Sequence, residues 1–206
     1  MKERRFGNTG TMVSEIGQGT WQLGTRWGDP FNREEAMKNT KTIFLAGGCF
    51  WGMQKYFDQF EGILETETGY ANGPTADPTY KEVCADSGHA ETLRIMYDPR
   101  KISLRKLLDD YFLVIDPLSV NRQGGDSGIQ YRTGIYYTDA DDLPEILTRA
   151  AEEERKLGEK LAVEILPLEN FYPAEEYHQK YLDKNPGGYC HIPSHMFTLG
   201  KKDGRS

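Results

Sequence analysis

The chain has 206 residues and a formal net charge of −7, so it suits one domain with an appended segment, and its acidic balance argues against nucleic-acid binding or a polybasic membrane surface. No apolar run is long enough to span a bilayer and the N-terminus lacks a signal-peptide layout, so we expect a cytoplasmic location. The three cysteines, Cys49, Cys84 and Cys190, lie far apart and indicate neither a disulfide framework nor a zinc ribbon.

Residues 1–40 differ in character from the rest, being rich in glycine, threonine and charged residues with no sustained period. The runs RFGNTG at 5–10 and VSEIGQGTWQLG at 13–24 resemble the start of aldo-keto reductases, where such a segment forms a hairpin and the first barrel strand. The chain that remains is too short for a TIM barrel with its nicotinamide site. We therefore expect an N-terminal extension that is disordered or packed as a hairpin, and no nicotinamide cofactor.

From residue 41 onward the sequence shows regular hydrophobic periods. They predict, in chain order, strands and helices over 42–46 (strand), 49–60 (helix), 63–70 (strand), 92–97 (strand), 103–115 (helix) and 131–137 (strand). This order is the split βαβ pattern of a ferredoxin-like, two-layer α/β sandwich with helices on one sheet face. The remainder predicts a helix over 141–158, a strand over 163–168, a short helix over 174–183 and a long coil tail.

Cys49 is the first candidate for chemistry, because it follows a predicted strand and two glycines in the run GGCFWG at 47–52. A helix that begins at Cys49 would present free N–H groups and the positive end of its dipole to the thiol, and both favour a thiolate. Phe50 and Trp51 could wall an apolar pocket for a methyl or methylene group. The alternative is a small buried cysteine at a tight turn, with both rings in the core.

Two further segments carry polar groups that could serve such a thiol. Glu91, in GHAE at 88–91, precedes a predicted strand, and a desolvated carboxyl beside tyrosines would stay protonated and donate a proton near neutral pH. The loop over 121–130 crowds hydrogen-bonding groups among glycines, so Asp126 and Tyr131 could orient a polar oxygen or a water. The alternatives are a solvated glutamate and an aspartate that merely caps the loop.

Cys190 follows two glycines near the C-terminus, on a segment that could bring a second thiol to the first. A disulfide requires the two Cα atoms to lie within about 7 Å, which a glycine-rich tail can reach, so Cys190 is a candidate resolving thiol. Cys84 is expected to be buried near a strand, although it could compete for the same role. An alternative is a metal site on the tail, whose spacing matches no common zinc pattern; its ligands would be His178, Cys190, His191 and His195.

Five motifs occur in order between residues 41 and 190: GCFWG at 48–52, GHAE at 88–91, QGGDSGIQYR at 123–132, YHQKYL at 177–182 and NPGGYC at 185–190. As a set they resemble the A-type peptide-methionine sulfoxide reductases. The resemblance implies a ferredoxin-like sandwich with additions over residues 41–206. It also implies an enzyme that reduces one of the two methionine sulfoxide epimers, without a bound cofactor and with an external dithiol such as thioredoxin as reductant.

The resemblance further implies roles for the polar residues singled out above. The Cys49 thiolate would attack the sulfoxide sulfur while Glu91 protonates the oxygen, because an unprotonated oxide is a very poor leaving group. Tyr80 and Tyr131 would assist through hydrogen bonds, and Asp126 would hold a polar contact or a water.

The remaining implied roles concern the methyl group and the return to the reduced enzyme. Phe50 and Trp51 would hold the methyl of the substrate, and Cys190 would condense with the sulfenic acid left on Cys49 to form a disulfide that thioredoxin reduces. The tail carries no further cysteine beyond Cys190, so the relay is expected to use two thiols only. Gly125 stands where the family often has asparagine, which is expected to loosen the loop.

Two rival functions belong to other classes. A cysteine hydrolase would pair Cys49 with His89 or His178, show an acyl-enzyme burst with activated esters and need no reductant. A metal-binding or interaction module would use the cysteine and histidines of the tail, which metal analysis would detect. Both rivals explain fewer of the five motifs.

Overall fold

The structure, a computed structural model, describes residues 3–5, 12–14 and 40–199. The chain divides into two compact units, Met1–Lys38 and Asn39–Ser206. In the first unit, β1 (Glu3–Arg5) and β2 (Met12–Ser14) pair antiparallel, and the rest of the segment that resembles aldo-keto reductases lies outside the described residues. Within the described ranges, no helix is long and apolar enough to cross a bilayer.

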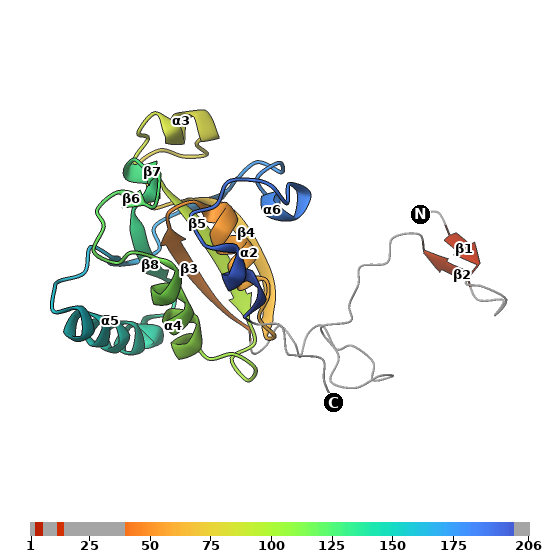
Figure 1. Cartoon of the computed structure of the whole chain (residues 1–206). Coiled ribbons are helices and arrows are strands. Elements are labelled where there is room, and N and C mark those ends of the chain that lie inside the picture. The colour runs from red at the N-terminus through yellow and green to blue at the C-terminus, as the bar shows by residue number, and fades with distance from the viewer. Residues whose placement is uncertain (1–2, 6–11, 15–39, 200–206) are drawn as a thin grey trace. The chain divides into compact units, whose positions relative to one another are not determined.

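The second unit is built on one six-stranded sheet with the strand order β10-β4-β5-β3-β8-β9, of which Figure 1 labels β4, β5, β3 and β8. In chain order these strands are β3 (Lys41–Gly47), β4 (Ile63–Ala71), β5 (Ala90–Tyr97), β8 (Thr133–Tyr137), β9 (Glu164–Pro167) and β10 (Phe171–Pro173). Neighbouring strands are antiparallel, except for the parallel pair of β8 and β9. The central order β4-β5-β3-β8 is that of a split βαβ unit, so the predicted ferredoxin-like fold is confirmed.

The main core lies between the sheet and the helices α2 (Phe50–Phe57), α4 (Leu104–Val114) and α5 (Leu143–Leu157). Successive side chains of a strand point to opposite faces, so Ile43 and Leu45 of β3 join this core while Phe44 lies in a smaller cluster on the other face. Ser103 caps α4 by accepting a hydrogen bond from the Lys106 N–H, as its sequence position predicts. The three helices therefore cover one face of the sheet.

The helix predicted over 174–183 is wrong, because most of this stretch forms turns and only α6 (Tyr181–Lys184) is helical. The side chain of Gln179 explains the difference. Its oxygen accepts from the Thr68 N–H at 3.0 Å and its amide donates to the Thr68 carbonyl at 2.9 Å, so it pairs with β4 as a strand residue would. Lys180 follows with φ 53°, which a right-handed helix does not permit.

Several other boundaries differ from the predictions. The helix predicted over 49–60 ends at Phe57, and the strand predicted from 131 begins at Thr133 because η1 (Ile129–Tyr131) is a 3₁₀ turn. Cys84, expected to be buried, is exposed at the end of α3. Besides 3₁₀ turns next to predicted elements, five elements of residues 40–199 were not predicted, and the last of them lies in the coil tail: α3 (Tyr80–Cys84), β6 (Arg122–Gln123), β7 (Asp126–Ser127), β10 (Phe171–Pro173) and η3 (Ser194–Thr198). A further short 3₁₀ turn, η2 (Ala140–Asp142), leads into α5.

Candidate active site

Cys49 lies where β3 turns into α2, and the turn depends on Gly48. Gly48 has φ +79°, and a Cβ at this position would come within 2.5 Å of the Gln123 Cβ, so both the backbone conformation and the space require glycine. Cys49 is the N-cap residue of α2 and is only 6% exposed. The thiol is therefore held against the N-terminus of a helix but sealed from bulk water.

The pKa of Cys49 is raised well above its usual value, whereas the helix terminus alone predicted a lowered one. Burial is the largest cause, and the negative charge of Glu91 is the next; the backbone N–H of Trp51 opposes them. The prediction from the helix end was therefore wrong in sign for the resting site. The N–H groups do favour the thiolate, but desolvation outweighs them.

Glu91 lies on β5 opposite Tyr70 of β4, and its Oε2 accepts a hydrogen bond from the Phe50 N–H at 3.2 Å. The side chain is 1% exposed. Burial raises the pKa of Glu91 to about 8, although the Phe50 N–H lowers it. Glu91 is thus protonated at neutral pH, and in that state it no longer adds a negative charge beside Cys49.

Three more polar residues named from the sequence gather around this carboxyl. Tyr80 begins α3 and Tyr131 ends η1; burial and the charge of Glu91 raise the pKa of both phenols, so both hydroxyls remain donors. Asp126 accepts a hydrogen bond from the Tyr189 hydroxyl, yet its buried Oδ2 has no partner within residues 40–199. Such an unpaired buried oxygen marks a place for a polar ligand atom or a water.

Phe50 and Trp51 form the apolar side of the site together with His178. Phe50 is 1% exposed and its ring centroid lies 5.2 Å from that of His178. The Trp51 ring stacks on Tyr181 with 3.8 Å between the ring centroids, and its indole N–H donates to Nδ1 of His178 at 2.9 Å. The indole is therefore fixed on one face by stacking and at its polar tip by a hydrogen bond.

His178 has a role in the site that the sequence did not suggest, since it was considered only as a metal ligand or a hydrolase base. Because Nδ1 accepts from Trp51, the ring proton lies on Nε2, and this buried N–H has no acceptor in the part of the chain that the structure describes. Burial lowers the pKa of His178, so the ring is neutral. Its position in YHQKYL, beside two tyrosines, was the available signal.

Glu175 also belongs to the site's framework. Its two carboxylate oxygens accept from the Tyr70 hydroxyl at 2.7 Å and from the Tyr80 N–H at 2.9 Å, which holds the start of α3 against β4. In sequence it is the first of two glutamates before Tyr177, a pattern typical of a solvated surface. Nothing local distinguishes it, so sequence reasoning missed it.

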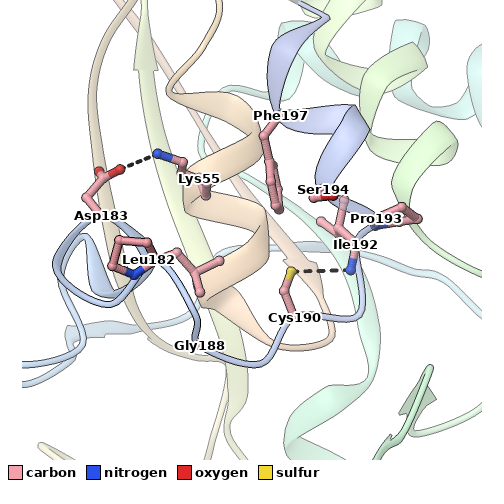
Figure 2. Close-up of a pocket in the computed structure, with 10 residues that line it drawn as sticks. Lys55, Leu182, Asp183, Gly188, Cys190, Ile192, Pro193, Ser194 and Phe197 are labelled. Atoms are coloured by element: carbon pink, nitrogen blue, oxygen red, sulfur yellow. Dashed lines mark hydrogen bonds and ion pairs between the residues drawn. The ribbon is translucent and has the colours of Figure 1, made fainter.

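Cys190 lies beside α2, at Gly52, one helical turn beyond Cys49. A Cβ on Gly52 would come within 2.5 Å of the Cys190 Sγ, so the absence of a side chain makes room for this thiol. The Sγ accepts a hydrogen bond from the Ile192 N–H at 3.3 Å, and burial raises its pKa. Cys190 lines a groove of about 420 Å³ between the tail and α2, whose lining residues are drawn in Figure 2. All three cysteines are free thiols.

Within residues 40–199, neither His89 nor the tail is arranged as the rival functions require. Both ring nitrogens of His89 are engaged by the Ser87 hydroxyl and the Thr75 carbonyl, each at 3.0 Å, so it does not serve Cys49 as a base. The tail, as far as it is described, forms no group of three or more His, Cys, Asp or Glu placed to hold a metal ion. Two free thiols beside a buried acid are instead typical of thiol-based redox catalysis, which defines the class of this protein.

Comparison with known proteins narrows this class. The model of the family described as peptide methionine sulfoxide reductase matches residues 41–203, and the chain belongs to that family. A peptide methionine sulfoxide reductase MsrA from Clostridium acetobutylicum is 57% identical over 157 residues, which cover 76% of this chain and 97% of the relative.

Two solved structures extend the likeness to the fold. The reduced form of Mxr1 from Saccharomyces cerevisiae superposes with a TM-score of 0.73 at 42% identity, covering 76% of this chain and 92% of that one. The structure of Mxr1 in complex with Trx2 has a TM-score of 0.51 at 29% identity, with coverages of 70% and 86%.

Proposed function

We propose that the protein reduces the S epimer of methionine sulfoxide to methionine, free or within oxidised proteins, and so repairs oxidative damage. Cys49 is the nucleophile, Cys190 the resolving thiol, and thioredoxin the external reductant. Family membership supports the reaction class, since A-type enzymes act on one sulfoxide epimer. The observation that carries the residue assignment is Glu91, a carboxyl 1% exposed at the helix terminus of Cys49 with a pKa of about 8.

The first step joins an attack on sulfur to proton transfer. The Cys49 sulfur attacks the sulfoxide sulfur while Glu91 gives its proton to the departing oxygen, with Tyr80 and Tyr131 donating hydrogen bonds to it; the proton that the Cys49 thiol loses returns to Glu91. The unpaired Oδ2 of Asp126 holds a polar atom or a water near the same oxygen. Collapse of the adduct releases methionine and leaves the oxygen on Cys49 as a sulfenic acid.

The apolar part of the site supplies selection for the methyl group. Methionine sulfoxide carries a methyl and an oxygen on one sulfur, so the wall of Phe50 and Trp51 on one side and the donors on the other distinguish the two substituents. Because the sulfur is chiral, only one epimer places both at once. The neutral His178 keeps the indole in position through its hydrogen bond.

The second step forms a Cys49–Cys190 disulfide and expels water. A dithiol then reduces this disulfide by exchange. Thioredoxin is the proposed dithiol, and the complex of the yeast relative Mxr1 with Trx2 supports it. No prosthetic cofactor takes part in these steps.

The extent of the catalytic part and its location are further proposals. We assign catalysis to residues 41–206, which contain every residue named above, and treat 1–40 as an extension without a catalytic role. The family match, which begins at residue 41, supports this division. A cytoplasmic location remains a prediction from composition.

The stereochemistry of the substrate tests the proposed function. Incubation with a dithiol and separated S and R epimers of methionine sulfoxide is expected to consume the S epimer alone, because the methyl wall and the proton donors lie on fixed sides of Cys49. Chiral chromatography of the remaining sulfoxide measures the outcome. Equal consumption of both epimers, or of neither, would contradict the proposal.

The Cys190→Ser variant tests the resolving role. It is expected to release one equivalent of methionine per enzyme and then to stop with thioredoxin, because serine cannot condense with the Cys49 sulfenic acid. Rapid-quench measurement of methionine gives the size of the burst. Cys84→Ser is the matched control, since Cys84 is exposed and outside the relay; it is expected to cycle normally. Normal cycling of Cys190→Ser would assign the resolving role to another thiol.

A further inference from the structure

His191 has an unusual environment for a histidine that follows a cysteine on a tail. Both of its ring nitrogens are buried and neither has a hydrogen-bond partner among residues 40–199. An unpaired buried imidazole costs free energy, and one held by tertiary structure marks a functional candidate. Burial also lowers the pKa of His191, so the ring is neutral and one nitrogen has a free lone pair.

His191 lies between two segments that border the Cys49 site. A Cβ on Gly48, the residue before Cys49, would lie 3.4 Å from Cε1 of His191, and one on Gly124 of the β6–β7 hairpin would lie 2.9 Å from its Cβ. The preceding Tyr189 holds the same hairpin, because its hydroxyl accepts from the Gly125 N–H at 3.3 Å. The tail is thus fixed on both sides of Cys190.

The second step of the proposed reaction creates a need for such a group. Cys190 must lose its proton to attack the sulfenic acid on Cys49, but burial raises the pKa of the Cys190 thiol and disfavours the thiolate. The oxygen that leaves Cys49 must meanwhile gain a proton to depart as water.

We propose that His191 carries the proton in the resolving step, an inference that rests on the proposed function. Its free ring nitrogen accepts the proton of the Cys190 thiol, and the sulfur's electron pair forms the S–S bond to Cys49. The S–O bond of the sulfenic acid breaks, and the leaving oxygen takes the proton from the imidazolium and departs as water. The Cys190 sulfur is oxidised as the Cys49 sulfur is reduced, so no further reactant enters.

Two substitutions separate proton transfer from packing. His191→Phe keeps a flat ring between Gly48 and Gly124 but cannot carry a proton. His191→Ala leaves space that added imidazole can enter. General acid–base groups typically contribute about 10²–10⁴-fold, so we expect both variants to form the disulfide about 100-fold more slowly than the wild type. Millimolar imidazole is expected to restore the rate of His191→Ala and to leave His191→Phe unchanged.

The measurement follows one turnover of the full-length chain without a reductant. Rapid-quench samples are assayed for methionine and, after alkylation, for the Cys49–Cys190 disulfide by mass spectrometry. We expect the methionine burst to be unchanged in both variants and only disulfide formation to slow. Absence of a burst in the wild type contradicts the proposed function itself. A normal disulfide rate in His191→Phe, or slow formation in His191→Ala that imidazole does not restore, overturns the role of His191.

The pH profile of disulfide formation gives a second readout. In the wild type the rate is expected to fall on acidification below the ordinary range of histidine, as His191 becomes protonated and can no longer accept a proton. The other titratable or charged side chains on the segments around it are Cys49, Arg122, Asp126, Tyr189 and Cys190. Since both variants retain all five, a fall that persists in His191→Phe would assign the titration to one of them and overturn the role.

Discussion

The Cys49→Ser variant is expected to release no methionine in a first turnover, a loss of at least about 10⁴-fold, because a serine hydroxyl is a far weaker nucleophile than a thiol at neutral pH. The buried helix terminus does not compensate. The N–H groups of α2 do not outweigh the effect of burial even on the pKa of Cys49, so they cannot ionise a hydroxyl whose own pKa is much higher. Rapid-quench detection of methionine with excess enzyme measures this directly.

Cys190→Ser is the control variant for this experiment. It lacks one thiol as well, but it is expected to release one equivalent where Cys49→Ser releases none. Circular dichroism and thermal unfolding check that both variants are folded. A full burst from Cys49→Ser would show that another thiol attacks the sulfoxide, and the exposed Cys84 would be the next to test.

The Glu91→Gln variant is expected to reduce methionine sulfoxide about 10²–10⁴-fold more slowly, since the amide keeps the size of the side chain but cannot transfer a proton. The protonation state of Glu91 determines how this difference in rate depends on pH. Glu91 acts as a donor while it is protonated, so its contribution is present below a pH of about 8 and is lost as the pH rises through that value. The advantage of the wild type over Glu91→Gln is therefore expected to shrink above pH 8.

The substitution Glu91→Gln is expected to lower activity but to remove a loss of stability that the wild type shows as the pH rises. In the unfolded chain Glu91 ionises near 4.5, but in the fold it holds its proton up to about 8, so the free energy of unfolding falls as the pH rises between these values. Every tenfold difference in proton affinity between the folded and unfolded chains corresponds to about 1.4 kcal/mol. Glutamine does not titrate, so Glu91→Gln is expected to gain stability relative to the wild type from pH 5 to pH 8 in urea unfolding.

These two readouts together distinguish a proton donor from a structural carboxyl. A variant that is slower than the wild type, yet gains stability relative to it up to pH 8, has lost proton transfer and remains folded. Unchanged rates in Glu91→Gln would remove its role as an acid. A stability difference that does not depend on pH would contradict the raised pKa.

The location of Cys49 could be predicted from its neighbours, whereas its protonation state could not. A strand, two glycines and a run of helical period specify a thiol at a helix terminus within ten residues of sequence. The pKa depends instead on burial and on Glu91, which lies 42 residues away and reaches Cys49 only through the pairing of β5 with β3. The local sequence predicts the helix terminus, but the tertiary structure decides whether that terminus or burial has the larger effect on the pKa of Cys49.

The same limit explains the elements that were missed. The 174–183 stretch has helical spacing, but Gln179 bonds to the backbone of Thr68, more than a hundred residues earlier. Glu175 and His178 acquire their roles from Tyr80 and Trp51, which come from other elements. A side chain whose partner is distant in sequence carries no local signal, so it is found only in the fold.

The two outer strands of the sheet offer a poor edge for pairing with another polypeptide. β9 and β10 have only four and three residues, and each ends in a proline, Pro167 and Pro173. Proline offers no N–H and a short edge offers few sites, so an extended chain has little to pair with. The edges of this sheet are therefore poor templates for strand addition by another polypeptide, including the oxidised proteins proposed above as substrates.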